Sequence, residues 1–280
     1  YKDINEVIDA QRDLVDVVGD VSGQEGTLAR IVRLQPRETV LRRSADDTDA
    51  YERVVVANAD TLVIVVAAAN PEPRTGFIDR AMVAAYDAGI QPILCITKTD
   101  LADPERLTQH YAHLDLEIFT IGPVNTHDDD HNLSPVLHPA SLDALQDRLS
   151  GHISALIGPS GVGKSTLVNA LVPNQHRATG EVSDLTGKGR HTSTSAMAIE
   201  LPGGGWIIDT PGVRSFGISH VHPDSFVAAF PDLSQFVKDC PRGCRHETGA
   251  QDCGLDEAVQ RGELDPGRLA SFRRMERAFI

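Results

Sequence analysis

Near the middle of the chain, the sequence reads Gly158-Pro159-Ser160-Gly161-Val162-Gly163-Lys164-Ser165. This stretch fits the phosphate-loop pattern G-x-x-x-x-G-K-[ST] at every fixed position, between an apolar run at residues 152–157 and a helical pattern that begins at Thr166. Backbone N–H groups in such a glycine-rich turn present partial positive charge to phosphate groups. The sequence therefore predicts a nucleotide site on a strand–loop–helix unit of an α/β domain.

The side chains of this loop have separate predicted roles. Lys164 is expected to reach the β- and γ-phosphates and is one of two residues that we assign to catalysis, and the Ser165 hydroxyl is expected to bind Mg²⁺. Backbone groups supply the other contacts. The predicted phosphate-binding residues are Gly158, Ser160, Gly161, Val162, Gly163, Lys164, Ser165 and Thr166.

A second motif, Thr97-Lys98-Thr99-Asp100, ends the apolar run at residues 92–96 and matches the guanine-recognition pattern [NT]-K-x-D. Guanine presents an N1–H and an exocyclic amine side by side, and one carboxylate can accept hydrogen bonds from both. Adenine has no such pair of donors on that edge. Asp100 is therefore expected to select guanine, the aliphatic stem of Lys98 to lie along the base, and Thr97 to complete the site.

A third motif, Asp209-Thr210-Pro211-Gly212, follows an apolar pattern at residues 206–208. Asp209 is expected to hold Mg²⁺ through water, and the Gly212 N–H to contact the γ-phosphate. Residues 189–194, Gly-Arg-His-Thr-Ser-Thr, lie between this motif and the phosphate loop and suit a first switch segment. One of its threonines would complete the magnesium shell; Thr194 is preferred, and Thr192 is the alternative.

Val213 follows Gly212 directly, at the position where many GTPases carry a glutamine that orients the attacking water. Valine can neither donate nor accept a hydrogen bond, so slow intrinsic turnover is expected. We hypothesise that His191, in the first switch segment, is catalytic and moves toward the γ-phosphate when a partner binds. Two alternatives remain: His191 only packs the switch segment, or Arg190 neutralises transition-state charge in cis.

The order of the motifs indicates a rearranged chain. An ordinary small GTPase runs from phosphate loop through first switch and D-x-x-G to base motif, whereas here the base motif comes first. A circular permutation gives this order because it moves only the ends of the chain. Apolar runs at residues 61–67 and 92–96, separated by a helical pattern at 78–88, predict parallel β-α-β units. A helix capped by Ser141 is expected to lead to the phosphate-loop strand.

The C-terminal part carries Cys240, Cys244, His246 and Cys253 in the spacing C-x3-C-x-H-x6-C. Three thiolates and an imidazole suit one tetrahedral, structural Zn²⁺. A disulfide would leave an odd thiol and ignore the histidine, and scattered core cysteines would not explain the clustering. Cys95, the fourth cysteine, lies in an apolar strand pattern and is expected to be a small buried residue.

Taken together, these motifs resemble the ribosome small-subunit-dependent GTPase A family (RsgA-type) from about Val18 to the C-terminus. The resemblance implies an α/β, circularly permuted P-loop GTPase domain at residues 46–217, an N-terminal OB-fold β-barrel at 1–45 and a helical zinc-binding domain at 218–280. It also implies GTP hydrolysis stimulated by the small ribosomal subunit late in its assembly, with Mg²⁺ accompanying GTP and with rRNA as a partner. The second switch would couple the nucleotide state to the zinc domain.

Two features depart from the family pattern. Too little chain precedes Arg43 for a complete five-stranded barrel, and Tyr1 is not an initiator, so an incomplete barrel is expected. Where the family carries a Ser/Ala-containing loop against guanine O6, residues 120–123 read Thr-Ile-Gly-Pro and lead into an acidic insertion, so this contact is left unassigned. His and Asp at residues 127–131 could indicate a metal, but a solvated loop is expected.

Composition restricts the partners. At 280 residues the chain suits two or three domains, and its net charge of −14 argues against broad coating of RNA. No apolar stretch approaches the ~20 residues of a membrane span, and the cysteine usage fits a reducing compartment. We expect a cytoplasmic monomer. A small-molecule kinase and an RNA-binding module with vestigial motifs are the alternatives, which Asp100 and the complete motif set disfavour.

Arginines gather at two places in the chain. Either group could form a basic face toward rRNA, and for the C-terminal group an ordinary solvated helix face is the alternative. The groups are Arg30, Arg33, Arg37, Arg42 and Arg43 near the N-terminus and Arg268, Arg273, Arg274 and Arg277 near the C-terminus.

Overall fold

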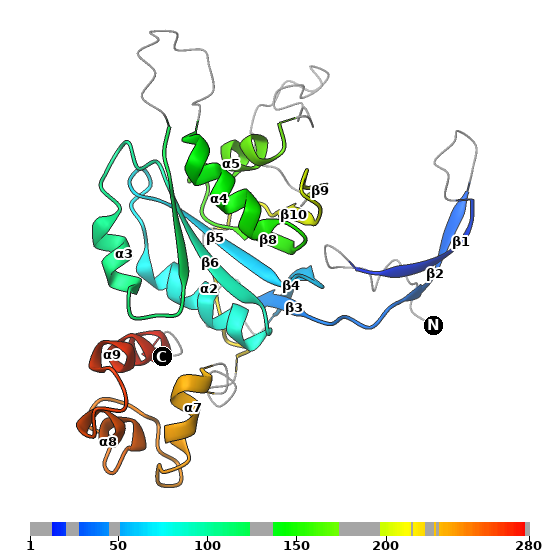
Figure 1. Cartoon of the computed structure of the whole chain (residues 1–280). Coiled ribbons are helices and arrows are strands. Elements are labelled where there is room, and N and C mark those ends of the chain that lie inside the picture. The colour runs from blue at the N-terminus through cyan, green and yellow to red at the C-terminus, as the bar shows by residue number, and fades with distance from the viewer. Residues whose placement is uncertain are drawn as a thin grey trace.

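The computed structural model describes residues 13–20, 28–44, 51–123, 137–173, 197–213, 215–221, 227 and 230–277. Its centre is a six-stranded sheet (Figure 1). The strands are β5 (Thr61–Ala67), β6 (Gln91–Thr97), β7 (Glu117–Ile121), β8 (Ile153–Ile157), β9 (Met197–Glu200) and β10 (Trp206–Asp209). Their spatial order is β7-β6-β5-β8-β10-β9, and only β9 runs antiparallel to its neighbour. The predicted parallel β-α-β domain is therefore confirmed.

Helices cover both faces of this sheet (Figure 1). On one face lie α2 (Thr75–Asp87) and α3 (Glu105–Tyr111), and on the other lie α4 (Pro139–Leu149) and α5 (Lys164–Leu171). Because successive strand residues point to opposite faces, β5 alternates between the two cores: Ile64 packs on the first and Val65 on the second, both fully buried. Such a strand reads as a continuous apolar run, as the sequence does at residues 61–67.

One predicted boundary is wrong. The helix expected to start after Ser141 begins at Pro139, with His138 as its N-cap, so that Ser141 lies inside α4. Proline suits the first helical position because its φ is already helical and its missing N–H would have no partner there. The preference of proline for this position thus prevailed over the capping preference of serine. The predicted end at Leu149 is correct.

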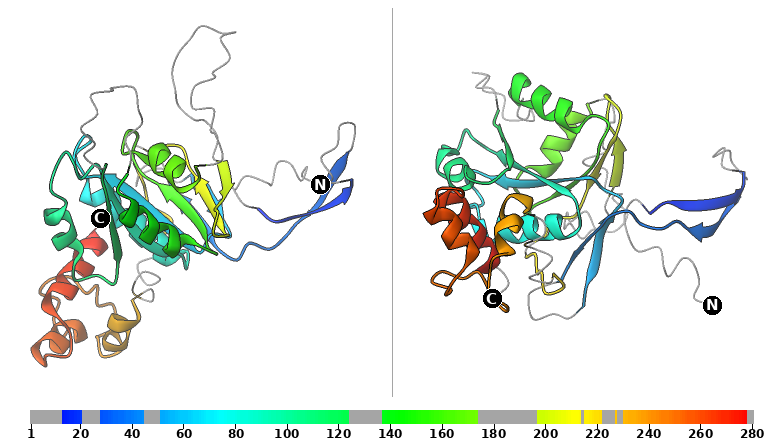
Figure 2. Two further views of the ribbon diagram at one scale, coloured as in Figure 1. Left: turned by 45° about the horizontal axis from the view of Figure 1, so that its top comes forward. Right: turned by 60° about the horizontal axis from the view of Figure 1, so that its bottom comes forward.

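The N-terminal strands form two small sheets. β1 (Val15–Gly19) and β2 (Ala29–Leu34) make an antiparallel hairpin that projects from the body of the molecule (Figures 1 and 2). β3 (Val40–Arg43) pairs with β4 (Arg53–Ala57), and Leu41 and Val56 are fully buried in the core beside α2. The described N-terminal ranges contain no closed barrel, so the OB-fold and the boundary between residues 45 and 46 stay predictions.

The C-terminal part packs on α2, on the side away from the sheet (Figure 1). It contains α7 (Pro231–Val237), α8 (Gly254–Gln260) and α9 (Pro266–Glu276). The Phe230 ring, 1% exposed, lies 4.7 Å from the Tyr86 ring of α2 and 5.6 Å from the Phe272 ring of α9, both edge-on. Edge-to-face aromatic contacts add to the apolar burial, so one continuous core joins α2 to the C-terminal helices.

A buried polar contact crosses the same junction. Asp79 of α2 is 4% exposed and accepts a hydrogen bond from the Tyr111 hydroxyl at 2.9 Å. Arg274 of α9 lies 3.4 Å from the same carboxylate and stacks over the Tyr111 ring at 5.2 Å. Burial raises the pKa of Asp79, and the positive charge of Arg274 opposes this shift.

Within the described ranges, no helix has the length and apolar character that crossing a membrane requires.

Candidate nucleotide site and metal centre

The phosphate loop follows β8, at the point where the strand order of the sheet reverses. From β5 the chain continues outward to β6 and β7, whereas β10 lies on the other side of β8. Open parallel sheets bind ligands at such a point, beyond the carboxyl ends of the strands. Gly161 and Gly163 have φ of +80° and +97°, a conformation that favours glycine. A Cβ at Gly158 would lie only 2.2 Å from the Val65 carbonyl oxygen, so the loop needs glycine here too.

Lys164 begins α5 and is 7% exposed. Its Nζ donates hydrogen bonds to the carbonyl oxygens of Gly158 at 2.7 Å and Pro159 at 3.1 Å. Burial lowers the pKa of Lys164, and the nearby charge of Asp209 opposes this shift. The lysine head group is thus held inside the loop, while Ser165, predicted to bind Mg²⁺, lies exposed on the next position of the helix.

The D-x-x-G segment packs directly on the phosphate loop. Asp209 ends β10 in register with Leu156 of β8, and the Thr210 hydroxyl donates to the Leu156 carbonyl oxygen at 2.6 Å. The Val213 N–H donates to the Gly158 carbonyl oxygen at 3.2 Å. A Cβ at Gly212 would lie 3.1 Å from Ser160 Cα. These contacts place Asp209 and Gly212 beside the loop, where the predicted magnesium and γ-phosphate contacts require them.

The base motif begins at Thr97, the last residue of β6, and is tied to the same loop. The Thr97 hydroxyl lies within hydrogen-bonding distance of the Val66 carbonyl oxygen, at 3.1 Å, and of the Val162 carbonyl oxygen. Lys98 has φ of +55°, and its Nζ donates to the Asn70 carbonyl oxygen. Thr97 therefore connects the strand that carries the base motif to the phosphate loop.

A cavity of about 270 Å³ lies between the base motif and the first turns of α5. Its lining joins the base motif, the end of β7 and the phosphate-loop helix. The lining residues are Thr97, Lys98, Asp100, Leu101, Ile121, Pro123, Leu137, Gly163, Thr166 and Leu167. The cavity is mostly apolar, and the Asp100 carboxylate belongs to its lining, as recognition of a flat base with paired donors requires.

The predicted first switch lies outside the described residues. His191, Arg190, Thr192 and Thr194 all fall in residues 174–196, and the possible metal-binding run at 127–131 falls in residues 124–136. Their roles stay predictions.

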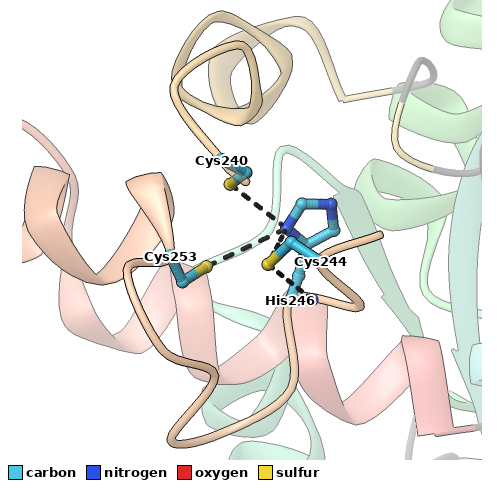
Figure 3. A group of neighbouring side chains, drawn as sticks. All are labelled: Cys240, Cys244, His246 and Cys253. Atoms are coloured by element: carbon cyan, nitrogen blue, oxygen red, sulfur yellow. Dashed lines mark hydrogen bonds between the residues drawn. The ribbon is translucent and has the colours of Figure 1, made fainter. Parts of the chain in front are cut away.

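The predicted zinc ligands come together in the C-terminal part. Cys240 follows α7, Cys253 precedes α8, and Cys244 and His246 lie in the loop between them (Figure 3). The four ligand atoms lie within 4.8 Å of one another. Nδ1 of His246 is 3.6 Å from the Sγ atoms of Cys240 and Cys244 and 3.9 Å from that of Cys253. A tetrahedral zinc ion with ordinary bond lengths places nitrogen and sulfur ligands about 3.6 Å apart, so the group fits Zn²⁺.

Backbone groups support this ligand set. The Gly254 N–H donates to Cys240 Sγ at 3.2 Å, and the His246 N–H donates to Cys244 Sγ at 3.4 Å. Such bonds stabilise thiolate charge and orient the ligands. Arg273, 8% exposed, donates from Nε to the His246 carbonyl oxygen at 2.6 Å and pairs with both carboxylate oxygens of Asp256. The loop that carries His246 is thereby anchored to α8 and α9.

A family model described as RsgA GTPase matches residues 34–219, more than half of the chain. The chain belongs to the RsgA GTPase family. A protein named small ribosomal subunit biogenesis GTPase RsgA from Pseudomonas aeruginosa is 38% identical over 90% of this chain and 71% of its own length. A protein of the same name from Ectopseudomonas mendocina is 39% identical over 87% of this chain and 68% of its own.

Solved structures agree with the RsgA-type fold. YjeQ from Thermotoga maritima is similar with a TM-score of 0.59 and 26% identity, covering 90% of this chain and 78% of YjeQ. YloQ, titled a circularly permuted GTPase, has a TM-score of 0.58 at 23% identity, covering 92% of this chain and 77% of YloQ. The predicted permuted GTPase fold is therefore confirmed, and neither a kinase nor a vestigial nucleotide module is supported.

One wall of the base cavity comes from Ile121 and Pro123, in the segment whose contact to guanine the sequence leaves unassigned, and from Leu137. Pro123 forms an isolated β-bridge with Leu137, and both residues line the cavity beside Ile121. A Cβ at Gly122 would lie 2.2 Å from the Thr99 hydroxyl oxygen, so this glycine allows the base motif to approach β7. The position of Gly122 directly after a strand was the sequence signal available for this wall. Leu137 gave no sequence signal, because it reaches the site only through the bridge to Pro123.

The arginines of this RsgA-family chain are largely ion-paired. In the N-terminal group Arg33 pairs with Asp16, Arg37 with Asp13 and Arg42 with Glu52. In the C-terminal group Arg268 pairs with Asp232, Arg273 with Asp256 and Arg274 with Asp79. Arg273 is buried, so it belongs neither to a solvated helix face nor to a basic surface.

Proposed function

We propose that this chain binds GTP at the site at the carboxyl ends of β6, β8 and β10, hydrolyses it to GDP and phosphate, and acts in biogenesis of the small ribosomal subunit. One observation carries the proposal: Asp100 and the phosphate-loop residues Gly163 and Thr166 line a single cavity. A carboxylate that accepts two guanine donors, next to a phosphate loop, selects GTP over ATP. Membership of the RsgA GTPase family and the names of the relatives support the hydrolase activity and the ribosomal role.

Magnesium would accompany GTP in this site. The Ser165 hydroxyl and the Asp209 carboxylate are oxygen donors of the kind Mg²⁺ prefers, and Thr194 is the proposed third contributor. When bound, the ion would neutralise charge on the β- and γ-phosphates. Lys164 would give up its carbonyl contacts and turn to the same oxygens, and the Gly212 N–H would bind the γ-phosphate.

Orientation of the attacking water must come from outside D-x-x-G. Val213 is 8% exposed, and its aliphatic side chain offers no hydrogen bond. This supports a slow intrinsic rate and stimulation by the small subunit, with His191 as the residue that the partner would bring into place. The same reasoning leaves Lys164 and Gly212 as electrostatic groups whose contribution does not depend on the partner.

The second switch would carry the nucleotide state to the zinc domain. Phe216, four residues after Gly212, places its ring 6.1 Å from the Phe77 ring of α2. The C-terminal helices pack on the same helix. Movement of the segment after Gly212 would therefore change the support of α9, a switching device of the order–disorder kind.

The remaining assignments follow from this role. Zn²⁺ bound by Cys240, Cys244, His246 and Cys253 would be structural, since four protein ligands leave no open position. We expect contact with rRNA as well as subunit proteins, action as a monomer, and location in the cytoplasm with the assembling subunits. The three domains are proposed at residues 1–45, 46–217 and 218–280.

The test is GTP hydrolysis with and without purified small ribosomal subunits, with ATP as the control nucleotide. Strong stimulation with GTP and none with ATP is the expected result. Lys164→Ala should abolish both basal and stimulated turnover while the zinc content stays unchanged. Tight GTP binding without stimulation by small subunits would contradict the ribosomal role and leave a guanine switch with another partner.

A further inference from the structure

A second cavity, of about 890 Å³, opens between the GTPase domain and the C-terminal helices. Gln91, the first residue of β6, lines it, whereas the base motif begins at Thr97, the last residue of that strand. The cavity therefore lies at the opposite edge of the sheet from the nucleotide. One wall comes from the end of α2 and from residues 112–115, and the other from α7 and from residues 263–268. We call it the junction groove.

The floor of the junction groove is aromatic. Tyr86, Phe230 and Phe236 line it, and the first two rings form the edge-on contact that joins α2 to the C-terminal part. Tyr86 and Phe236 are half-buried. A volume of this size lies within the range of ordinary ligand pockets, about 300–1,000 Å³. The groove can therefore hold several side chains of a bound segment.

Its rim is acidic. Four exposed carboxylates line the groove, against one arginine. The carboxylates belong to Asp115, Asp232, Glu263 and Asp265, and the arginine is Arg268. Burial raises the pKa of Tyr86 to about 12; the charge of Arg268 opposes this shift, and the charges of Asp115 and Asp232 add to it. Both signs of charge on the rim thus act on the aromatic floor.

The chain itself shows how this surface binds a guanidinium. The Arg268 head group lies 5.2 Å above the Phe230 ring and donates from Nε and Nη2 to the two oxygens of Asp232, at 2.7 and 3.0 Å. Stacking on an aromatic face combined with a bidentate carboxylate is a strong mode of arginine recognition. Among the described residues Asp115 forms no ion pair, and Glu263 pairs only on the surface, with Arg261. These two carboxylates are available to a second cation.

We propose that the junction groove binds a basic polypeptide segment of a small-subunit protein, with an arginine or lysine stem on the aromatic floor and its head group between Asp115 and Glu263. The inference rests on the proposed function, which makes the small subunit the partner. Proteins that bind RNA are rich in Lys and Arg, and the same charge pattern would repel an RNA backbone. Because both domains line the groove, such a segment would bind only while the zinc domain is docked on the GTPase domain.

The experiment uses the full chain, purified small subunits and a non-hydrolysable GTP analogue, with p-benzoylphenylalanine in place of Gln235. This exposed residue lines the groove, and Gln260, exposed on α8 outside the groove, is the matched control position. We expect a photo-adduct with a small-subunit protein at least fivefold more abundant from position 235 than from position 260. Asp115→Lys combined with Glu263→Lys should reduce that adduct at least fivefold, whereas Asp143→Lys on α4 should not.

The outcomes separate the two proposals. Three cross-linking results would overturn the groove assignment: an adduct with rRNA alone, no adduct, or an adduct that survives the double charge reversal. Tighter binding of small subunits by the charge-reversed variant would overturn it too. Stimulated GTP hydrolysis is measured on the same samples. If stimulation persists while the protein adduct is missing, the groove proposal fails and the proposed function stands. If small subunits neither bind nor stimulate, both fail together. Both reversed carboxylates are exposed, so folding is expected to change little.

Discussion

Ser44, the residue directly after β3, forms an isolated antiparallel β-bridge with Gly217, which follows the D-x-x-G motif. The Ser44 N–H donates to the Gly217 carbonyl oxygen at 3.1 Å, and the Gly217 N–H donates back at 3.2 Å. Ser44 is fully buried, and the Ser219 hydroxyl donates to its hydroxyl oxygen at 3.1 Å. The segment after Gly212 is therefore bound to the N-terminal strand pair as well as to α2.

Because of this bridge, we expect the stability of β3 to depend on which nucleotide is bound. When a GTP analogue replaces GDP, binding of the γ-phosphate should order the second switch and slow amide hydrogen exchange at residues 40–44 by about tenfold, the effect of roughly one backbone hydrogen bond. Gly217→Pro removes one donor of the bridge and should abolish the difference. Exchange in α4, on the other face of the sheet, serves as the control. Equal exchange of residues 40–44 in both nucleotide states would contradict the coupling.

Asp100→Asn should change the base that the site accepts. The substitution removes the carboxylate, which accepts two charge-assisted hydrogen bonds from guanine, each worth about 1.5–3 kcal/mol. GTP affinity should therefore fall by roughly 100-fold or more. Xanthine carries a carbonyl where guanine carries its amine, and the new amide N–H can donate to it. Equilibrium binding of XTP and GTP measures the change. Asp143→Asn is the control, and a variant that keeps GTP affinity would remove Asp100 from base recognition.

Zinc removal should unfold the C-terminal part selectively. Cys253 is a proposed ligand and is 1% exposed. Cys253→Ser should lower the zinc content from the expected one ion per chain to near zero. The loss of zinc should also lower the Tm of the C-terminal part. Cys95 is fully buried in β6, so Cys95→Ala should keep the zinc while losing core packing. Metal analysis and calorimetry measure both. A Cys253→Ser variant with full zinc occupancy would contradict the ligand set.

The same cysteines should differ in reactivity. Burial raises the pKa of Cys95 to about 12, and the thiolate is the form that reacts. Burial also raises the pKa of Cys240, to about 11, but this burial should be lost when chelation of zinc unfolds the C-terminal part. After chelation, Ellman's reagent at pH 8 should therefore titrate the three zinc-site thiols and spare Cys95. The fourth thiol should react only after denaturant is added. A chelated native sample that shows all four thiols at once would mean that the β6 core opens with the zinc domain.

Glu276 should make stability fall as pH rises. Burial and the charge of Glu247 raise its pKa from 4.5 to about 7, with Arg273 opposing the shift. Between these two values the folded chain keeps a proton that the unfolded chain releases, so stability decreases with rising pH through that window and the penalty is complete above it. Glu276→Gln should match the parent near pH 4.5 and exceed it at pH 8.

Solvent screening limits the stability that Glu276→Gln gains at high pH, because the Glu276 side chain is only partly buried. We expect about 1 kcal/mol, or roughly 2–4 °C in Tm for a chain of this size. Thermal unfolding between pH 4.5 and 8 measures it, with Glu200→Gln on the exposed side of β9 as the control. A Tm difference that is constant with pH would show that Glu276 does not titrate in this window.

The position of most candidate nucleotide-site residues could be predicted because the motifs lie at the ends of parallel strands. The carboxyl ends of β6, β8 and β10 meet at one edge of the sheet, so residues at three strand ends come together whatever the loops between them do. The contact between Pro123 and Leu137 could not be predicted because it depends on a bridge across thirteen intervening residues, 124–136, rather than on a local pattern. The start of α4 was misplaced because two local preferences compete within three residues.

The sequence by itself determined which residues can carry the chemistry of this protein: a phosphate-loop motif, a carboxylate in the guanine-recognition pattern, and three thiols with an imidazole at zinc spacing. Each depends on residues close together in the chain, where backbone geometry leaves few alternatives. Only the tertiary structure decided where distant charges lie. Arg273 became a buried support of the zinc loop, Arg268 part of an acidic groove, and Ser44 a neighbour of the second switch. Such contacts depend on the path of the whole chain, because packing brings together segments that no local pattern relates.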